Sequence, residues 1–280
     1  MGRQRGSRAA GQRGSASSKT HSRNTSDDTL AEALLPGVIP QYEIPGWREE
    51  YGVVGGITGR GSEPGRGFDL GLWSDQPVGE VMSRWLAFRR SMDDFVAVAL
   101  GNQVHGVELM NLEAGRGWVY VDGIDGWITT TAGILLTVTI ADCIPVYLVA
   151  PGKGVALLHA GWRGTAGGIL GAGIARLASA TVVSPSQLLM HCGVGICGQC
   201  YEVGPEVMAG CGAAADGLGP WHIDLRSILI AQARKAGLIQ VTTSSWCSAH
   251  DRGQFYSHRA SRGADGRMVA YIGMLSRADQ

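Results

Sequence analysis

The sequence predicts an α+β fold in a single domain, with mixed β-sheets flanked by helices. Segments rich in β-branched residues alternate with segments of helical spacing, yet several strands follow one another directly. Parallel strands need a long crossover between them, so directly adjoining strands indicate a mixed sheet. Hydrophobic residues make up 45% of the 280-residue chain and charged residues 17%, which is typical of a globular protein.

The elements of the first half follow from the spacing of apolar residues. Residues 51–61 predict a strand entering a glycine-rich turn, and residues 77–92 have the apolar spacing of a helix. Residues 95–110 alternate as a strand with a break, and GWVYVDGIDGWITT follows as a strand and turn. Residues 134–150 and 154–160 then predict a strand pair joined across PGKG.

The second half repeats this alternation. Residues 164–180 predict a helix of small residues, and residues 223–238 form the clearest amphipathic pattern. Between and after them we expect a strand in QLLMHCGVGI, a helix in VGPEVMAGCG, and strands in IQVTTSSWCS and RMVAYIGML.

The chain divides into a basic tail with a linker, residues 1–38, and a folded domain, residues 39–280. Residues 1–26 carry six Lys and Arg, no acidic residue and almost no large aliphatic residue, so we expect disorder there. The tail has neither the apolar face of a transit peptide nor a secretory segment. Removing its six basic residues from the chain's 24 leaves 18 against 24 acidic ones, so the folded body is a poor nucleic-acid binder.

The longest apolar stretch, GILLTVTIADCIPVYLVA, is interrupted by Asp142 and Pro145 and is rich in β-branched residues. We interpret it as strands, and expect no membrane span. The six cysteines come without an export signal, which favours reduced thiols and a cytoplasmic location.

Polar residues stand where the apolar runs end. Cys143 follows one predicted strand, His159 ends the next, and His105 lies at an earlier break. Two imidazoles and a thiolate suit Zn²⁺ and leave one tetrahedral position open for water or substrate. Because the spacings are long, the alternative remains a small buried cysteine and two histidines in core or cap roles.

Three arginines are candidates for holding an anion. Arg163 lies in HAGWRGTAGG, where glycines permit close backbone approach and a helix follows. Arg60 and Arg259 also stand beside glycine or aromatic residues. The alternative for each of the three is a surface ion pair.

Cys197-x-x-Cys200 is a weak redox or zinc signal, and no second C-x-x-C completes a four-thiolate site. We interpret these thiols as structural or incidental. Asp142 either orients a metal ligand or caps a turn.

Several stretches together resemble the bacterial laccase-domain family, which is also described as polyphenol oxidase-type. They are NQVHG (102–106), ADCIPV (141–146), HAGWRGT (159–165), GVGICGQCYEVGPEV (193–207), IDLRSI (223–228) and CSAHDRGQFYSHRASRGADGRMVAYI (247–272). The resemblance implies an αββα-like sandwich and one zinc ion on His105, Cys143 and His159. It further implies phosphorolysis of adenosine, inosine, guanosine and methylthioadenosine, together with hydrolytic deamination of adenosine.

For these reactions we expect Cys143, His159 and Arg163 to be catalytic. The assignment of Arg60, Arg163 and Arg259 to substrate or phosphate binding is our own and is not implied by the resemblance. Small nucleosides and phosphate are then the partners. The chain departs from the family's usual residues at Val194, Cys197, His258 and Ala260. The last two put the carboxy-terminal side of the pocket, and its substrate preference, in question.

Three rival functions remain open. A multicopper centre needs many histidines in His-x-His pairs, whereas this chain has seven histidines and no such pair. Copper bound in vitro at the same site would give only adventitious phenol oxidation. A peptidoglycan-precursor-editing amidase would use the same ligands, and a non-catalytic binding protein would use the same fold.

Overall fold

The computed structural model describes residues 1–2, 28–62, 67–72 and 76–276. The predicted disorder of the basic tail falls mainly on residues 3–27, which lie outside the described ranges.

Two seven-stranded sheets dominate the described chain, and both are mixed, as predicted. The first sheet has the spatial order β1 (Asp28–Leu30), β15 (Gln240–Ser244), β12 (Leu189–Cys192), β10 (Ile144–Ala150), β11 (Gly154–Ala160), β8 (Gly126–Thr129) and β6 (Leu109–Asn111). The second has the order β2 (Ala33–Leu34), β3 (Gln41–Glu43), β4 (Val53–Thr58), β16 (Met268–Met274), β9 (Ile134–Ile140), β5 (Ala97–Asn102) and β7 (Gly117–Asp122). Strands β13 (Glu202–Val203) and β14 (Trp221–His222) form a separate pair.

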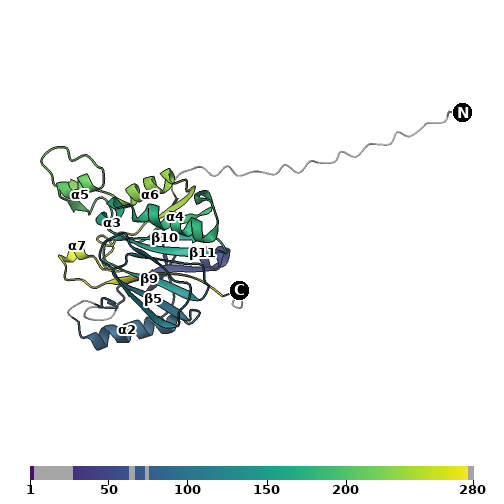
Figure 1. The fold of residues 1–280 in the computed structure, drawn as a ribbon, viewed down its shortest axis with the longest axis horizontal. Coiled ribbons are helices and arrows are strands. Elements are labelled where there is room, and N and C mark those ends of the chain that lie inside the picture. Colours follow the sequence, from purple (N-terminus) through teal and green to yellow (C-terminus); the bar gives the residue numbers. More distant parts are fainter. Residues whose placement is uncertain (3–27, 63–66, 73–75, 277–280) are drawn as a thin grey trace.

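Helices cover the outer faces of both sheets and complete an αββα sandwich (Figure 1). The helical segments are α1 (Trp47–Tyr51), α2 (Val78–Ser91), α3 (Trp162–Ala166), α4 (Ile169–Thr181), the 3₁₀ turn η1 (Pro185–Gln187), α5 (Pro205–Gly210), α6 (Leu225–Lys235) and α7 (His258–Ser261). Helix α4 packs on β10 and β11 and α6 packs on β12 and β15 of the same sheet, whereas α2 packs on the opposite sheet. The fold class predicted from the sequence is confirmed.

Three apolar layers hold the sandwich together. Between the sheets, Trp127 and Tyr147 are almost fully buried among aliphatic strand residues. A second cluster joins α4 and α6 to their sheet, and a third joins Trp85 and Phe88 of α2 to the other. Burial of apolar surface on both faces explains why the central strands are continuous hydrophobic runs in the sequence.

The strand predicted over residues 134–150 is two strands in different sheets. Strand β9 ends at Ile140 in one sheet, and β10 begins at Ile144 in the other. Between them Asp142 adopts a φ of 84°, which turns the chain sharply across the sandwich. Apolar periodicity could not show this break, because both strands are buried on both faces.

The structured chain begins before the predicted domain boundary at residue 39. Strand β1 pairs with β15 and strand β2 pairs with β3, so the presumed linker contributes to both sheets. Glu32, between them, is only 2% exposed, and its carboxylate binds His191 Nε2 at 3.1 Å and accepts from Ser244 Oγ at 2.6 Å. Two- and three-residue strands leave too short a pattern to read from sequence.

The helix predicted over residues 164–180 is likewise divided, into α3 and α4. Gly168 separates them with a φ of 85°, a conformation that glycine adopts at little cost. Among the described residues, no helix combines the length and apolarity needed to cross a bilayer.

Candidate metal centre

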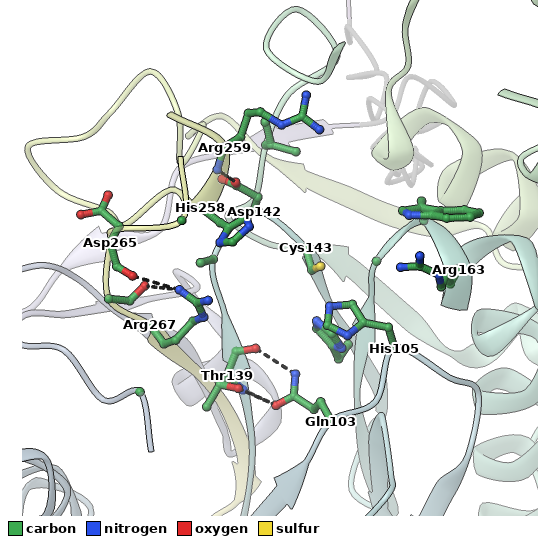
Figure 2. A pocket seen from close by; sticks show the side chains of 18 of the residues that line it. Gln103, His105, Thr139, Asp142, Cys143, Arg163, His258, Arg259, Asp265 and Arg267 are labelled. Atoms are coloured by element: carbon green, nitrogen blue, oxygen red, sulfur yellow. Dashed lines mark hydrogen bonds between the residues drawn. The ribbon is translucent and has the colours of Figure 1, made fainter. Parts of the chain in front are cut away.

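Connections between the two sheets bring the predicted ligands together. His105 lies in the link from β5 to β6, and Cys143 lies in the turn from β9 to β10. His159 is the penultimate residue of β11. One donor atom from each of the three lies within 4.8 Å of the others, and the two imidazole rings meet edge to face at 4.8 Å (Figure 2).

Strand register accounts for this convergence. In the antiparallel pair of β10 and β11, Pro145 stands opposite His159, which places Cys143 beside the end of β11. Gly161 follows that end, and a Cβ added there would lie 3.0 Å from the Cys143 sulfur and 3.3 Å from the His105 ring. The glycine in the HAGWRG motif therefore leaves the space that the two donors occupy.

Asp125 supports two of the three donors from behind. Its buried carboxylate accepts backbone N–H bonds from His105 at 2.9 Å and Gly106 at 2.6 Å, and meets His159 Nδ1 at 2.8 Å. Because Nδ1 is engaged, Nε2 of His159 is the nitrogen that faces the cluster. Burial alone would raise the pKa of the Asp125 carboxyl, but the bonds from His159 and Gly106 outweigh it and the pKa is lowered.

The electrostatics of the cluster favour a thiolate. Burial raises the pKa of the Cys143 thiol, but the charge of His159 and the hydrogen bond with His105 overcome this and lower it to about 6. The pKa of His159 is raised by the Cys143 sulfur and by Asp125, against the effect of burial. A cation that enters here replaces the proton on His159 and meets a sulfur already in its ligating form.

Backbone strain marks the same places. His105 has a φ of 60° and Asp142 a φ of 84°, both uncommon for residues with a side chain. The Asp142 carboxylate accepts from Ser248 Oγ at 2.7 Å and from the backbone N–H of Arg259 at 2.6 Å. Asp142 therefore ties the turn that presents Cys143 to the carboxy-terminal segment.

A cavity of about 780 Å³ opens over the three donors, a size suited to a small organic substrate. Its wall includes Gln103, whose side chain clamps the end of β9 by accepting from the Thr139 N–H at 2.7 Å and donating to the Thr139 carbonyl at 2.9 Å. His258 and Arg259 form the carboxy-terminal side of the cavity, so one family departure does face the pocket. Val194 is buried away from solvent, and the Ala260 N–H bonds Ser257 Oγ as a helix cap.

The predicted arginines do not all reach this cavity. Arg163 and Arg259 line it and are exposed, with their guanidinium groups over the rings of Trp162 and Tyr201. Arg60 does not line it, because its guanidinium is held by the Asp265 carboxylate at 2.6 Å and lies over the Tyr256 ring. Arg60 therefore lies beside the Asp265 carboxylate and not on the cavity wall, and its binding of phosphate stays a prediction.

Sequence reasoning missed Asp125 and Arg267. Arg267 lines the cavity on the side opposite Arg163 (Figure 2). Asp125 stands at a strand joint in DGIDGW, the same signal that identified the three donors. Arg267 follows a glycine before the last strand, a position with no distinguishing pattern.

A family model described as "Multi-copper polyphenol oxidoreductase laccase" matches residues 54–275. The chain belongs to this laccase-domain family. The matched range includes all three donors and the strands of both sheets from β4 onward, whereas β1, β2 and β3 precede it.

Several relatives of this chain have the names of enzymes. A purine nucleoside phosphorylase of Deinococcus radiodurans is 35% identical over 88% of this chain and 96% of its own. Purine nucleoside phosphorylase YlmD of Geobacillus stearothermophilus is 32% identical over 85% of this chain and 98% of its own. Its crystal structure superposes with a TM-score of 0.75 over 88% of this chain and 100% of that one, at 27% identity. Adenosine deaminase RL5, from an unknown prokaryotic organism, is 35% identical over 50% of this chain and 58% of its own.

Proposed function

We propose that this chain is a zinc-dependent purine nucleoside phosphorylase that also deaminates adenosine, and that acts on adenosine, inosine, guanosine and methylthioadenosine. The observation that carries the proposal is a cluster of two imidazoles and one thiol at the floor of a 780 Å³ cavity flanked by arginines. The names of the relatives supply the substrate class.

His105, Cys143 and His159 would hold the metal. A soft thiolate with two imidazoles is a donor set that zinc prefers, and the Asp125 bond fixes the His159 ring in the ligating orientation. A zinc ion with three protein ligands supplies Lewis acidity at its remaining open position. All three donors line the cavity, so a substrate in the cavity would lie beside the metal that they would hold.

The arginines would hold the phosphate that attacks the ribose. In phosphorolysis a phosphate oxygen forms a bond to the anomeric carbon while the bond from that carbon to the purine nitrogen breaks. Arg163 and Arg259 are the exposed cations on the cavity wall, and each is steadied by an aromatic ring. Guanidinium groups suit phosphate because they donate two parallel hydrogen bonds. We assign phosphate binding to these two residues.

Deamination needs water at purine C6 instead of phosphate at the ribose, with ammonia as the leaving group. His258 offers an imidazole on the cavity wall, at a position where the family usually has another residue. We assign it to the purine side of the pocket, where it influences which base is accepted. Such substrates accord with the cytoplasmic location predicted from the sequence.

Product analysis tests this proposal. Zinc-loaded protein is incubated with adenosine, with and without phosphate, and the products are separated by chromatography. Adenine with ribose 1-phosphate, formed only when phosphate is present, establishes the phosphorylase, and inosine formed without phosphate establishes the deaminase. If neither product forms, the nucleoside assignment is rejected and hydrolysis of a cell-wall precursor amide is favoured.

Variants connect the activity to the cluster. We expect Cys143→Ala to fold and to lose both activities, and Cys211→Ala, which removes a cysteine outside the cluster, to retain them. Loading with copper in place of zinc separates any phenol oxidation from the nucleoside reactions.

A further inference from the structure

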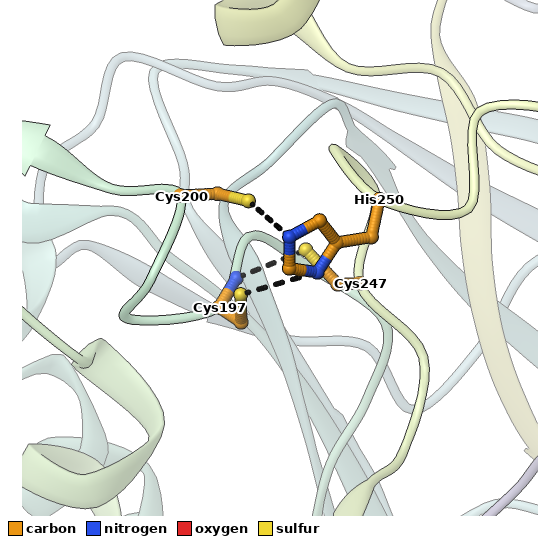
Figure 3. Close-up of side chains that lie close together, drawn as sticks. All are labelled: Cys197, Cys200, Cys247 and His250. Atoms are coloured by element: carbon orange, nitrogen blue, oxygen red, sulfur yellow. Dashed lines mark hydrogen bonds between the residues drawn. The ribbon is translucent and has the colours of Figure 1, made fainter.

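A second cluster of metal-binding side chains lies outside the candidate active site. Cys197 and Cys200 come from the loop after β12, whereas Cys247 and His250 come from the loop after β15. One donor atom from each of the four lies within 4.8 Å of the others (Figure 3). These two loops, called the arms of the cluster below, are about 50 residues apart in the sequence. Each arm carries its two donors three positions apart. The partner that C-x-x-C lacked in the sequence is therefore a C-x-x-H.

The separations approach those of a closed zinc site. Tetrahedral zinc, with bonds of about 2.3 Å to sulfur and 2.0 Å to nitrogen, keeps its ligand atoms roughly 3.5–3.8 Å apart. The His250 ring lies between two sulfurs, with Nε2 at 3.0 Å from Cys200 Sγ and Nδ1 at 3.7 Å from Cys197 Sγ. His250 is exposed, so its ring can turn one nitrogen toward a shared ion without repacking the core.

The backbone holds both arms in place. The Cys200 N–H donates to the Cys197 carbonyl at 3.0 Å, and the Asp251 N–H donates to the Cys247 carbonyl at 2.8 Å, which closes one turn in each arm. The Cys197 N–H donates to Cys247 Sγ at 3.3 Å, the kind of bond that stabilises an anionic sulfur. Gly195 and Cys247 form a parallel bridge that joins the arms.

We propose that Cys197, Cys200, Cys247 and His250 hold a structural zinc ion. Three thiols and one imidazole fill all four tetrahedral positions, which distinguishes this site from the three-donor cluster with an open position. None of the three cysteines forms a disulfide. A closed site of this kind contributes folding free energy and takes no part in the chemistry.

The zinc would fix one wall of the active-site cavity. Beside Cys197, the Ile196 N–H donates to the Asp142 carbonyl at 2.9 Å, and beside Cys247, Ser248 Oγ donates to the Asp142 carboxylate at 2.7 Å. Asp142 precedes the thiol of the candidate active site. Joining the two arms therefore holds the turn that presents Cys143.

Zinc content per chain tests the proposal without any assay of activity. The full chain is purified with zinc, and its metal is counted by elemental mass spectrometry and native mass spectrometry. We expect two zinc ions in the wild type, one in Cys200→Ser, and two in the matched control Cys211→Ser. An unchanged zinc count in Cys200→Ser would overturn the proposal, as would iron or a Cys197–Cys200 disulfide in place of zinc.

The variant His105→Ala provides an independent test, because it leaves the four-donor cluster intact. We expect this variant to retain one zinc ion, and a chain without zinc would overturn the proposal even if Cys200→Ser fails to fold. Loss of nucleoside activity bears on the other site, so failure of one assignment is distinguishable from failure of the other. We also expect Cys200→Ser to lower Tm by about 10 °C, and an unchanged Tm would contradict a structural role.

Discussion

Asp125 serves both candidate histidines at once. Its carboxylate fixes the His159 ring by a 2.8 Å contact and the backbone at His105 by a 2.9 Å hydrogen bond. Carboxylates behind metal-binding histidines set the tautomer and raise the basicity of the ligand. A residue outside the proposed ligand set therefore fixes the position of two of the three candidate donors.

Asp125→Asn should weaken zinc binding at this centre by about 10–100-fold. An amide of the same shape lacks the charge that stabilises His159 as a ligand. Titration against a zinc chelator measures the change. The exposed Asp122→Asn, at the end of β7, is the matched control and should bind zinc as the wild type does. Equal affinity in the Asp125 variant and the control would contradict the assigned role.

Glu32 makes a different contribution, to stability. Burial raises the pKa of its carboxyl, but the bond and charge of His191 and the bond from Ser244 outweigh burial, and the pKa falls below its ordinary 4.5. A carboxyl whose pKa is lower in the folded chain than in the unfolded chain stabilises the fold at every pH above its unfolded-state pKa. That stabilisation is lost as the pH drops through the folded pKa.

Glu32→Gln should therefore cost about 1–3 kcal/mol of unfolding free energy at pH 7. The difference from wild type should shrink as the pH falls below 4.5, where the carboxyl becomes protonated. Urea unfolding at several pH values measures it. A difference that grows toward acid pH would contradict this account of the Glu32, His191 and Ser244 contacts.

Strand ends and the links between sheets assemble the site. The sequence located the donors because each interrupts an apolar run, and the register of β10 with β11 then brings Cys143 beside His159. It could not show that residues 134–150 divide between two sheets, because doubly buried strands have no distinguishing periodicity. The sequence also could not show that Cys197 and Cys247 lie close together, because their proximity depends on the parallel pairing of β12 with β15.

Gly161→Ala tests how closely β11 approaches the donors. The added methyl would lie 3.0 Å from Cys143 Sγ and 3.3 Å from the His105 ring, so we expect weaker zinc binding at this site. Gly171→Ala, in α4, meets no atom within 4 Å and should instead leave zinc binding unchanged and raise stability by about 0.5–1 kcal/mol. Chelator titration and thermal melting measure both, and unaltered zinc affinity in Gly161→Ala would contradict the packing described.

The sandwich as a whole depends on a segment that composition assigned to a linker. Strands β1 and β2 add to the edges of the two sheets, and Glu32 between them lies against His191 of β12. Very short strands give no readable pattern, whereas α2 and α6 were predicted nearly to their ends from apolar spacing. Long periodic elements can therefore be predicted from the sequence, whereas the short segment that carries β1, Glu32 and β2 cannot.

Two truncations test this boundary. A chain that starts at residue 39 loses β1, β2 and Glu32, and should lose on the order of 3–5 kcal/mol because His191 is left buried without its carboxylate. A chain that starts at residue 28 keeps all three and should melt close to the full-length protein. Equal melting temperatures for the two truncations would show that the segment adds nothing to the fold.

The central claim is that links between the two sheets assemble one metal centre from His105, Cys143 and His159. Anomalous diffraction at the zinc absorption edge, from crystals of zinc-loaded protein, tests it most directly. We predict an anomalous peak within bonding distance of Cys143 Sγ, His159 Nε2 and a ring nitrogen of His105. The absence of a peak among these three residues, with zinc present in the crystal, would contradict the account.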